Sequence, residues 1–133
     1  MKRYLVPSLQ IFTAIGILLF WLLFFTVGMA PENPPEGYWQ FEHAFPFPDV
    51  VLCFALAAGG ILVIKDHRLG RIISIAAAGG LIFLGMVDFS FNIQNGMYAF
   101  SFADTVTNGI INTWCVTLGV AMLFYYYPSI ASE

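Results

Sequence analysis

Long apolar runs separated by three short polar connections constrain this chain more than any other feature. The five lysine and arginine residues are confined to the N-terminus and one connection: Lys2, Arg3, Lys65, Arg68 and Arg71. Most acidic residues lie in or beside the other two connections. Apolar runs of about 20 residues are long enough to cross a bilayer as helices, and Lys and Arg gather in cytoplasmic connections. The pattern therefore predicts several membrane spans with a defined orientation.

The composition agrees with this interpretation. Hydrophobic residues make up 59% of the chain and charged residues 10%, which would leave a soluble domain of 133 residues with too little polar surface. We expect an all-α, integral membrane four-helix bundle that forms one transmembrane domain over residues 1–133. The spans are predicted at about 5–29, 48–64, 70–90 and 105–127.

The positive-inside rule predicts the orientation of these spans. It places both termini and the basic connection on the cytoplasmic side, and the connections at 30–47 and 91–104 outside. Residues 1–30 resemble a signal peptide, but the apolar run from Leu5 to Met29 exceeds the roughly 7–15 residues of such segments. We therefore expect residues 1–30 to be retained as the first span of a multi-pass protein of the cell membrane. We expect no nucleic-acid partner.

Small residues and prolines predict how the connections fold. The sequence Ala-Ala-Gly-Gly occurs at 57–60 and again at 77–80, so the second and third spans should form a tight antiparallel hairpin. The prolines of connection 30–47 disfavour regular helix, and its aromatic residues resist full solvation. We expect this connection to be an extended, partly buried cap over the bundle. Ser101 and Asp104 have the spacing of a helix-capping box.

Polar residues of three spans recur at helical spacing and should face one another, because lipid cannot satisfy them. Asp88 is the least readily explained as structural, since the carboxyl end of a helix disfavours an anion. Asp49 suits a helix start, and Asn108 and Asn112 also suit interhelical hydrogen bonding. We predict an outward-opening pocket lined by Asp49, Asp88, Asn92, Asn108 and Asn112. Trp39, Glu42 and His43 of the connection 30–47 should cover it.

Catalytic and metal-binding signatures are missing from the sequence. It has no Cys-x-x-Cys, no His-Glu-x-x-His and no phosphate-binding glycine loop. The predicted spans place Cys53 and Cys115 at comparable depths, which would permit a disulfide, although isolated cysteines in apolar spans are usually inert. The scattered acids and His43 give no metal-specific spacing, and we expect no metal and no cofactor.

The segment Phe41-Glu42-x-x-Phe45-Pro46-x-Pro48-Asp49, with the glycine-rich hairpin and residues 88–95, resembles a group of small four-span prokaryotic membrane proteins. The resemblance covers most of the chain and implies the four-span fold but no activity. The layout is distantly similar to the EXPERA-domain family of sterol isomerases and sterol-binding proteins. The chain lacks a clear copy of that family's catalytic His and Glu arrangement, so no catalytic residue is carried over.

The leading functional prediction is a binding protein that takes a lipid-like or small amphipathic ligand from the outer leaflet. One alternative is an accessory or structural subunit that packs against a larger membrane complex. The other is an enzyme acting on a lipid or isoprenoid, with Asp88 and His43 as acid and base. A homo-oligomer is a further possible assembly. Membrane lipid is an expected partner in each case.

Overall fold

A computed structural model describes the backbone of residues 2–131 and the side chains of 4–128, and it contains helices and no strand in that part of the chain. The elements follow in this order: α1 (Lys2–Leu23), a turn of π-helix η1 (Phe24–Gly28), α2 (Tyr38–His43), α3 (Pro46–Ile64), α4 (Arg68–Gln94), a 3₁₀ turn η2 (Met97–Ala99) and α5 (Phe102–Ala131). Within residues 2–131, four helical segments are long and apolar enough to cross a bilayer, which confirms the predicted all-α fold with four apolar helices.

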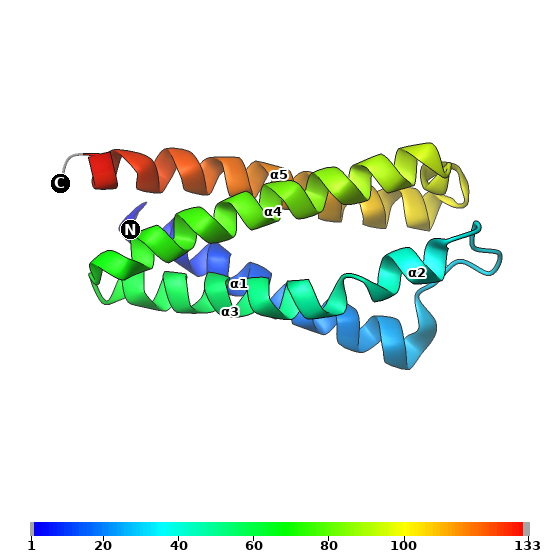
Figure 1. The fold of residues 1–133 in the computed structure, drawn as a ribbon, viewed down its shortest axis with the longest axis horizontal. Coiled ribbons are helices and arrows are strands. Elements are labelled where there is room, and N and C mark those ends of the chain that lie inside the picture. The colour runs from blue at the N-terminus through cyan, green and yellow to red at the C-terminus, as the bar shows by residue number, and fades with distance from the viewer. Residues whose placement is uncertain (1, 132–133) are drawn as a thin grey trace.

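The long helices run along one axis as two neighbouring pairs (Figure 1). Helices α1 and α3 pack together, as do α4 and α5, and the α3–α4 hairpin joins the two pairs. Helices α1 and α5 touch in few places, so the ring of helices is weakest between them. The α3–α4 turn, the start of α1 and the end of α5 share one end of the molecule, and α2 and η2 lie at the other.

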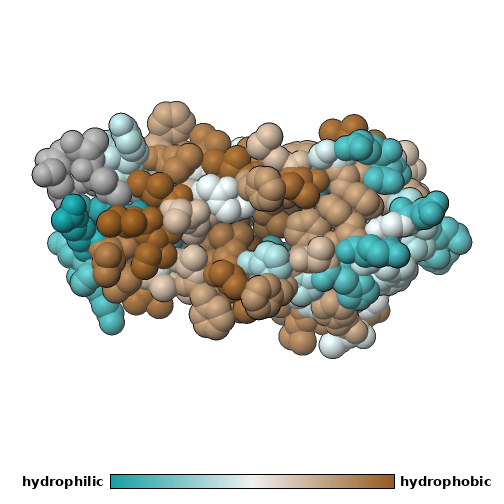
Figure 2. Space-filling view, in the orientation of Figure 1, coloured by the Kyte–Doolittle hydropathy of each residue, from teal (hydrophilic) through white to brown (hydrophobic). Residues whose placement is uncertain are grey.

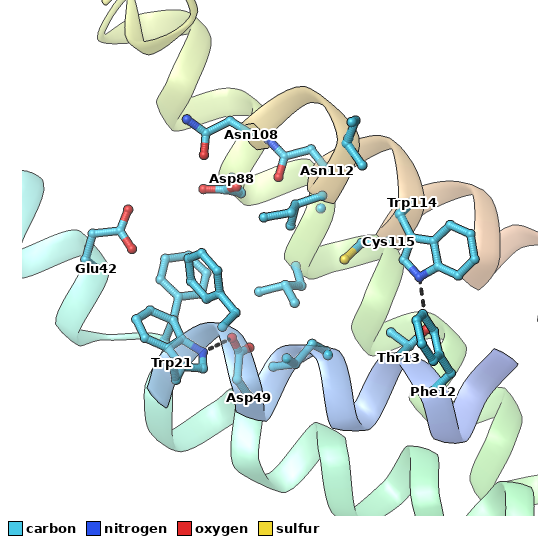
Figure 3. A pocket seen from close by; sticks show the side chains of 18 residues that line it. Phe12, Thr13, Trp21, Glu42, Asp49, Asp88, Asn108, Asn112, Trp114 and Cys115 are labelled. Carbon is cyan, nitrogen blue, oxygen red and sulfur yellow. Dashed lines mark hydrogen bonds between the residues drawn. The ribbon is translucent and has the colours of Figure 1, made fainter. Parts of the chain in front are cut away.

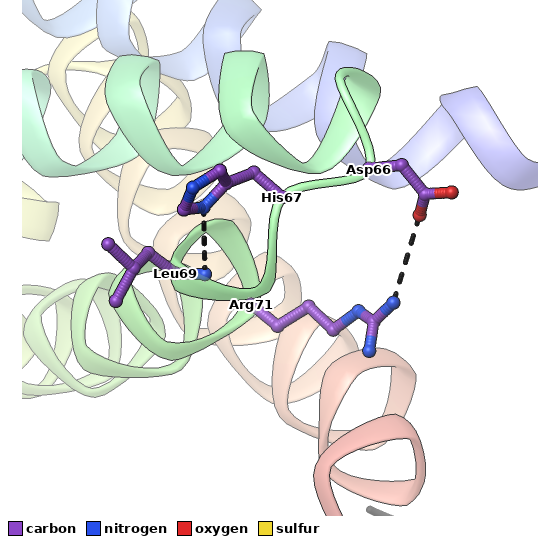
Figure 4. A network of polar contacts seen from close by, with 4 residues as sticks. All are labelled: Asp66, His67, Leu69 and Arg71. Atoms are coloured by element: carbon purple, nitrogen blue, oxygen red, sulfur yellow. Dashed lines mark hydrogen bonds and ion pairs between the residues drawn. The ribbon is translucent and has the colours of Figure 1, made fainter.

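Helices α3 and α4 approach closely, as the Ala-Ala-Gly-Gly sequences predict. A Cβ atom added to Gly59 would lie 2.6 Å from Ser74 Oγ, which is closer than real atoms allow. The turn between these helices is short (Figure 4). Asp66 adopts a left-handed φ of 61°, His67 Nδ1 accepts the Leu69 N–H at 3.2 Å, and Arg71 Nη2 lies 3.8 Å from Asp66 Oδ1.

A buried polar network ties all four long helices together. The Gln10 side chain on α1 is fully buried, and its Nε2 donates to Leu56 O on α3 at 3.0 Å and to Ser74 Oγ on α4 at 2.8 Å. The hydroxyl of Tyr126 on α5 donates to Gln10 Oε1 at 2.9 Å. Each group therefore gains a partner in a region that water does not reach, which fixes the relative positions of the helices.

The connection 30–47 differs from the extended cap that we predicted. It contains α2, and α3 begins at Pro46 rather than near Pro48. The physical reason is the placement of the prolines: none lies between 36 and 45, and proline is tolerated in a first helical turn, where its missing N–H has no intrahelical partner. The next helix, α4, also extends beyond the predicted end at about 90 to Gln94.

The capping-box prediction at the start of α5 is confirmed in part. Ser101 Oγ accepts the backbone N–H of Asp104 at 3.0 Å, as an N-cap residue does. The Asp104 carboxylate accepts the Ser101 hydroxyl at 2.7 Å instead of reaching back to a backbone N–H.

Apolar side chains cover the middle of the molecule, and hydrophilic residues gather at both ends (Figure 2). Large side chains on every long helix point outward: Phe12 is 66% exposed, Phe54 73%, Phe83 71% and Phe124 78%. A water-soluble monomer rarely exposes so continuous an apolar surface. The four apolar helices and this surface are typical of a multi-pass membrane protein.

Candidate functional site

A cavity of about 400 Å³ lies between the two helix pairs, in the half of the bundle nearer α2 (Figure 3). Most of its wall is apolar or aromatic. Six polar side chains interrupt that wall: Thr13, Glu42, Asp49, Asp88, Asn108 and Asn112. The predicted convergence of polar faces from several helices therefore occurs, and it encloses space rather than a solid core.

Asp49 is held on one side of the cavity by a tryptophan. It lies in the first turn of α3, where the helix dipole favours a carboxylate, and its side chain is 5% exposed. Its Oδ2 accepts the Nε1–H of Trp21 on α1 at 2.8 Å. The interhelical hydrogen bond fixes the carboxylate at the cavity wall, so Asp49 does more than start its helix.

Asp88 lies across the cavity, where Figure 3 shows it facing Asn108 and Asn112 of α5. Close contact of α4 with α5 brings these groups together: a Cβ atom on Gly85 would lie 2.8 Å from Val116 Cγ2. Asn112 is 1% exposed. Its Nδ2 donates to the Tyr98 hydroxyl at 2.9 Å, which orients the amide beside Asp88.

Glu42 reaches the cavity from α2, and Figure 3 shows it pointing toward the space between Asp49 and Asp88. Three carboxyl groups from three different helices therefore face one space. None of the residues that line this space is a lysine, arginine or histidine. The site combines negative charge with apolar walls.

Three of the eight predicted site residues lie outside the lining. Trp39 is 47% exposed and packs its ring against His43, whose Nδ1 lies 2.7 Å from Trp39 O. The His43 ring also packs against Phe25 of η1. Asn92, one turn after Asp88, is 3% exposed and its side chain lies beside the Asp88 carboxyl group, although its Nδ2 makes no hydrogen bond of normal length with the described residues. The structure thus brings together Glu42, Asp49, Asp88, Asn108 and Asn112.

Sequence reasoning missed the contribution of α1. Thr13 and Trp21 line the cavity, and Trp114 Nε1 on α5 donates to Thr13 Oγ1 at 2.9 Å, bridging the two helices that otherwise touch little. A signal was present, because Gln10, Thr13 and Trp21 share one helical face. It was weak because the remaining residues of that face are as apolar as those toward lipid.

Neither cysteine forms a disulfide. Cys53 is buried and its Sγ donates to Ala14 O at 3.3 Å, whereas Cys115 lines the cavity as a free thiol. In the part of the chain that the structure describes, no group of three or more His, Cys, Asp or Glu residues is arranged to hold a metal ion.

No protein-family model, curated protein or solved structure matches the chain. The function is therefore inferred from the geometry and chemistry of the cavity.

Proposed function

We propose that this chain is a multi-pass protein of the cell membrane that binds a lipid-like or small amphipathic ligand in the cavity. Both termini lie on the cytoplasmic side in this proposal. The observation that carries it is the cavity itself, which has polar groups toward the α2 end and apolar walls deeper in the bundle. Its volume of about 400 Å³ falls within the usual range of small-molecule sites.

The charge distribution supports the proposed orientation. All five lysine and arginine residues belong to the end of the molecule that holds the α3–α4 turn and the start of α1. The apolar surface between the two hydrophilic ends would lie in the hydrocarbon core. The cavity would then lie in the outer half of the bilayer, with α2 at its outer surface.

The opening of the cavity supports a ligand that partitions into lipid. Phe12 on α1 and Ile110 and Trp114 on α5 line the cavity and are also 66%, 64% and 38% exposed. They lie along the seam between α1 and α5, where the helices make few contacts. An amphiphile could enter through this seam from the membrane, keep its apolar part among side chains and place its polar group beside the carboxyl groups.

The test of binding is Asp88→Asn, which keeps the size of the side chain and removes its ability to ionise. We expect the variant to retain a different amount or kind of lipid after gentle detergent extraction, measured by mass spectrometry, with little change in melting temperature. Glu36→Gln is the matched control because Glu36 is exposed and outside the cavity.

A second variant, Asn112→Ala, separates binding from helix packing. If Asp88→Asn and Asn112→Ala both lower the melting temperature and keep the same bound species, these residues are interhelical contacts. A structural or accessory role would then replace the binding proposal.

Membrane orientation has its own test. In a variant with both native cysteines replaced by serine, a cysteine at Asn33 should react with an impermeant maleimide from outside. A cysteine at Asp66 should react only after permeabilisation, and replacing Lys65, Arg68 and Arg71 together should weaken this asymmetry. The opposite labelling pattern would contradict the proposed orientation.

A further inference from the structure

The charged side chains that line the cavity are all acidic. Glu42, Asp49 and Asp88 come from α2, α3 and α4 and face the shared space, and no basic side chain lines it. Lys65, Arg68 and Arg71 are at the opposite ends of α3 and α4. Carboxylates in apolar surroundings without a countercharge are costly, and they repel one another across a medium of low dielectric constant. A positively charged ligand would remove both penalties.

Aromatic rings occupy the same end of the cavity as the carboxyl groups. Phe20, Trp21 and Phe45 line it, and the rings of Phe20 and Trp21 meet edge to face with centroids 5.2 Å apart. Aromatic faces attract ammonium groups, and the attraction strengthens when the cation is desolvated. The rings of Phe20 and Phe45 make no hydrogen bond to a carboxyl group, so they favour a cation for a separate reason.

We propose that the ligand is an amphiphile whose polar end is an alkylammonium group, an inference that rests on the proposed binding function. The ammonium group lies between Glu42, Asp49 and Asp88, and the apolar part extends toward the seam between α1 and α5. Asp49 keeps its hydrogen bond to Trp21 and presents its other carboxylate oxygen to the ligand.

The spacing of the carboxyl groups selects an organic cation over a metal ion. A metal requires several ligands within bonding distance of one point, and the described residues contain no such group. Carboxyl groups distributed around a larger space suit a bulky ammonium group, which carries its charge over several carbon atoms. The volume of about 400 Å³ also limits the enclosed part to a headgroup with a short apolar segment.

The experiment compares three probes of equal chain length, namely decyltrimethylammonium, decanol and decyl sulfate. Their binding to the intact protein in a nonionic detergent is measured by titration calorimetry, with empty micelles as the background. We expect the dissociation constant of decyltrimethylammonium to be at least about tenfold lower than that of decanol, and decyl sulfate to show no binding above background.

Substitutions of single carboxyl residues test which of them bind the ammonium group. Asp88→Asn and Glu42→Gln should each raise the dissociation constant of decyltrimethylammonium about tenfold and change that of decanol by a clearly smaller factor, while Glu36→Gln, outside the cavity, should change neither. The two variants lie on different helices, so a folding defect in one does not remove the test. If a double-chained trimethylammonium lipid competes with decyltrimethylammonium, the natural ligand is a membrane lipid. If it does not compete, the natural ligand is a free lipophilic amine.

Two negative results have different meanings. Equal affinity for decyltrimethylammonium and decanol would overturn the inferred charge and leave the binding function in place. A lack of saturable binding for all three probes would overturn the binding function as well. The comparison of probes on the unmodified protein does not depend on any variant.

Discussion

The buried network around Gln10 gives the sharpest prediction about how this bundle is held together. We expect Gln10→Leu, which keeps approximately the same volume, to lower the free energy of unfolding. The substitution removes two hydrogen bonds that Gln10 donates, to Leu56 O and Ser74 Oγ, and the one that it accepts from Tyr126. Gln10 is fully buried, so water does not replace these partners.

The magnitude follows from the bonds that are lost. Interhelical hydrogen bonds in membrane proteins contribute about 0.6 kcal/mol each on average. The Tyr126 hydroxyl also loses its Gln10 partner but keeps Ser74 beside it, so the cost lies near the lower end of the about 1–3 kcal/mol of a buried donor left unpaired. Leu56 O loses less, because a backbone carbonyl within a helix has a helical partner as well. A total loss of about 2–3 kcal/mol is expected.

Reversible unfolding by sodium dodecyl sulfate in mixed micelles, followed by far-UV circular dichroism, measures the free energy directly. Tyr126→Phe alone removes the same bond, leaves the buried Gln10 Oε1 without its donor and should cost about 1–3 kcal/mol. In the double variant both partners of the Tyr126–Gln10 bond are absent, so neither is left unpaired by loss of the other, and the combined loss should be smaller than the two separate losses together. Gln94→Leu is the control, since Gln94 is exposed and bonds only locally to Ser90.

Two results would refute this reasoning. A Gln10→Leu protein at least as stable as the wild type would mean that packing, not the network, sets the helix positions. Losses that add to within about 0.3 kcal/mol would mean that Gln10 and Tyr126 do not act through a shared bond.

Three further predictions concern single contacts, each measured by the same unfolding assay. Gly59→Ala should lower the free energy of unfolding by more than about 1 kcal/mol, because the added Cβ would collide with the facing helix. Gly79→Ala should be neutral or stabilising, since nothing lies within 4 Å of that position. Equal effects of the two substitutions would contradict the close approach of the helices. Trp114→Phe and Thr13→Val remove the same hydrogen bond, so the double variant should lose little more than either single one, and full additivity would count against the bond. Ser101→Ala should cost about 1 kcal/mol through loss of its helix cap, and an unchanged stability would show that the cap is dispensable.

The sequence determined the helical architecture because the signals for it are local. Runs of about 20 apolar residues specify helices of spanning length, and the repeated Ala-Ala-Gly-Gly segment specifies a hairpin that permits close backbone contact. The acids and asparagines were predictable as inward-facing because few other positions satisfy polar groups in apolar surroundings. Asp49, Asp88, Asn108 and Asn112 therefore converge in the structure as the sequence predicts.

Only the tertiary structure decided which face of α1 lines the cavity, and how the polar groups pair. Helix α1 is apolar on most of its faces and carries only a weak periodic signal, so the sequence did not assign Thr13 and Trp21 to an interior face. The pairing of Trp21 with Asp49, and of Gln10 with Tyr126, joins residues far apart in the chain. The cavity lies where α1 and α5 make few contacts with each other. The separation of these two helices depends on the packing of all four long helices together and not on the sequence of any one segment.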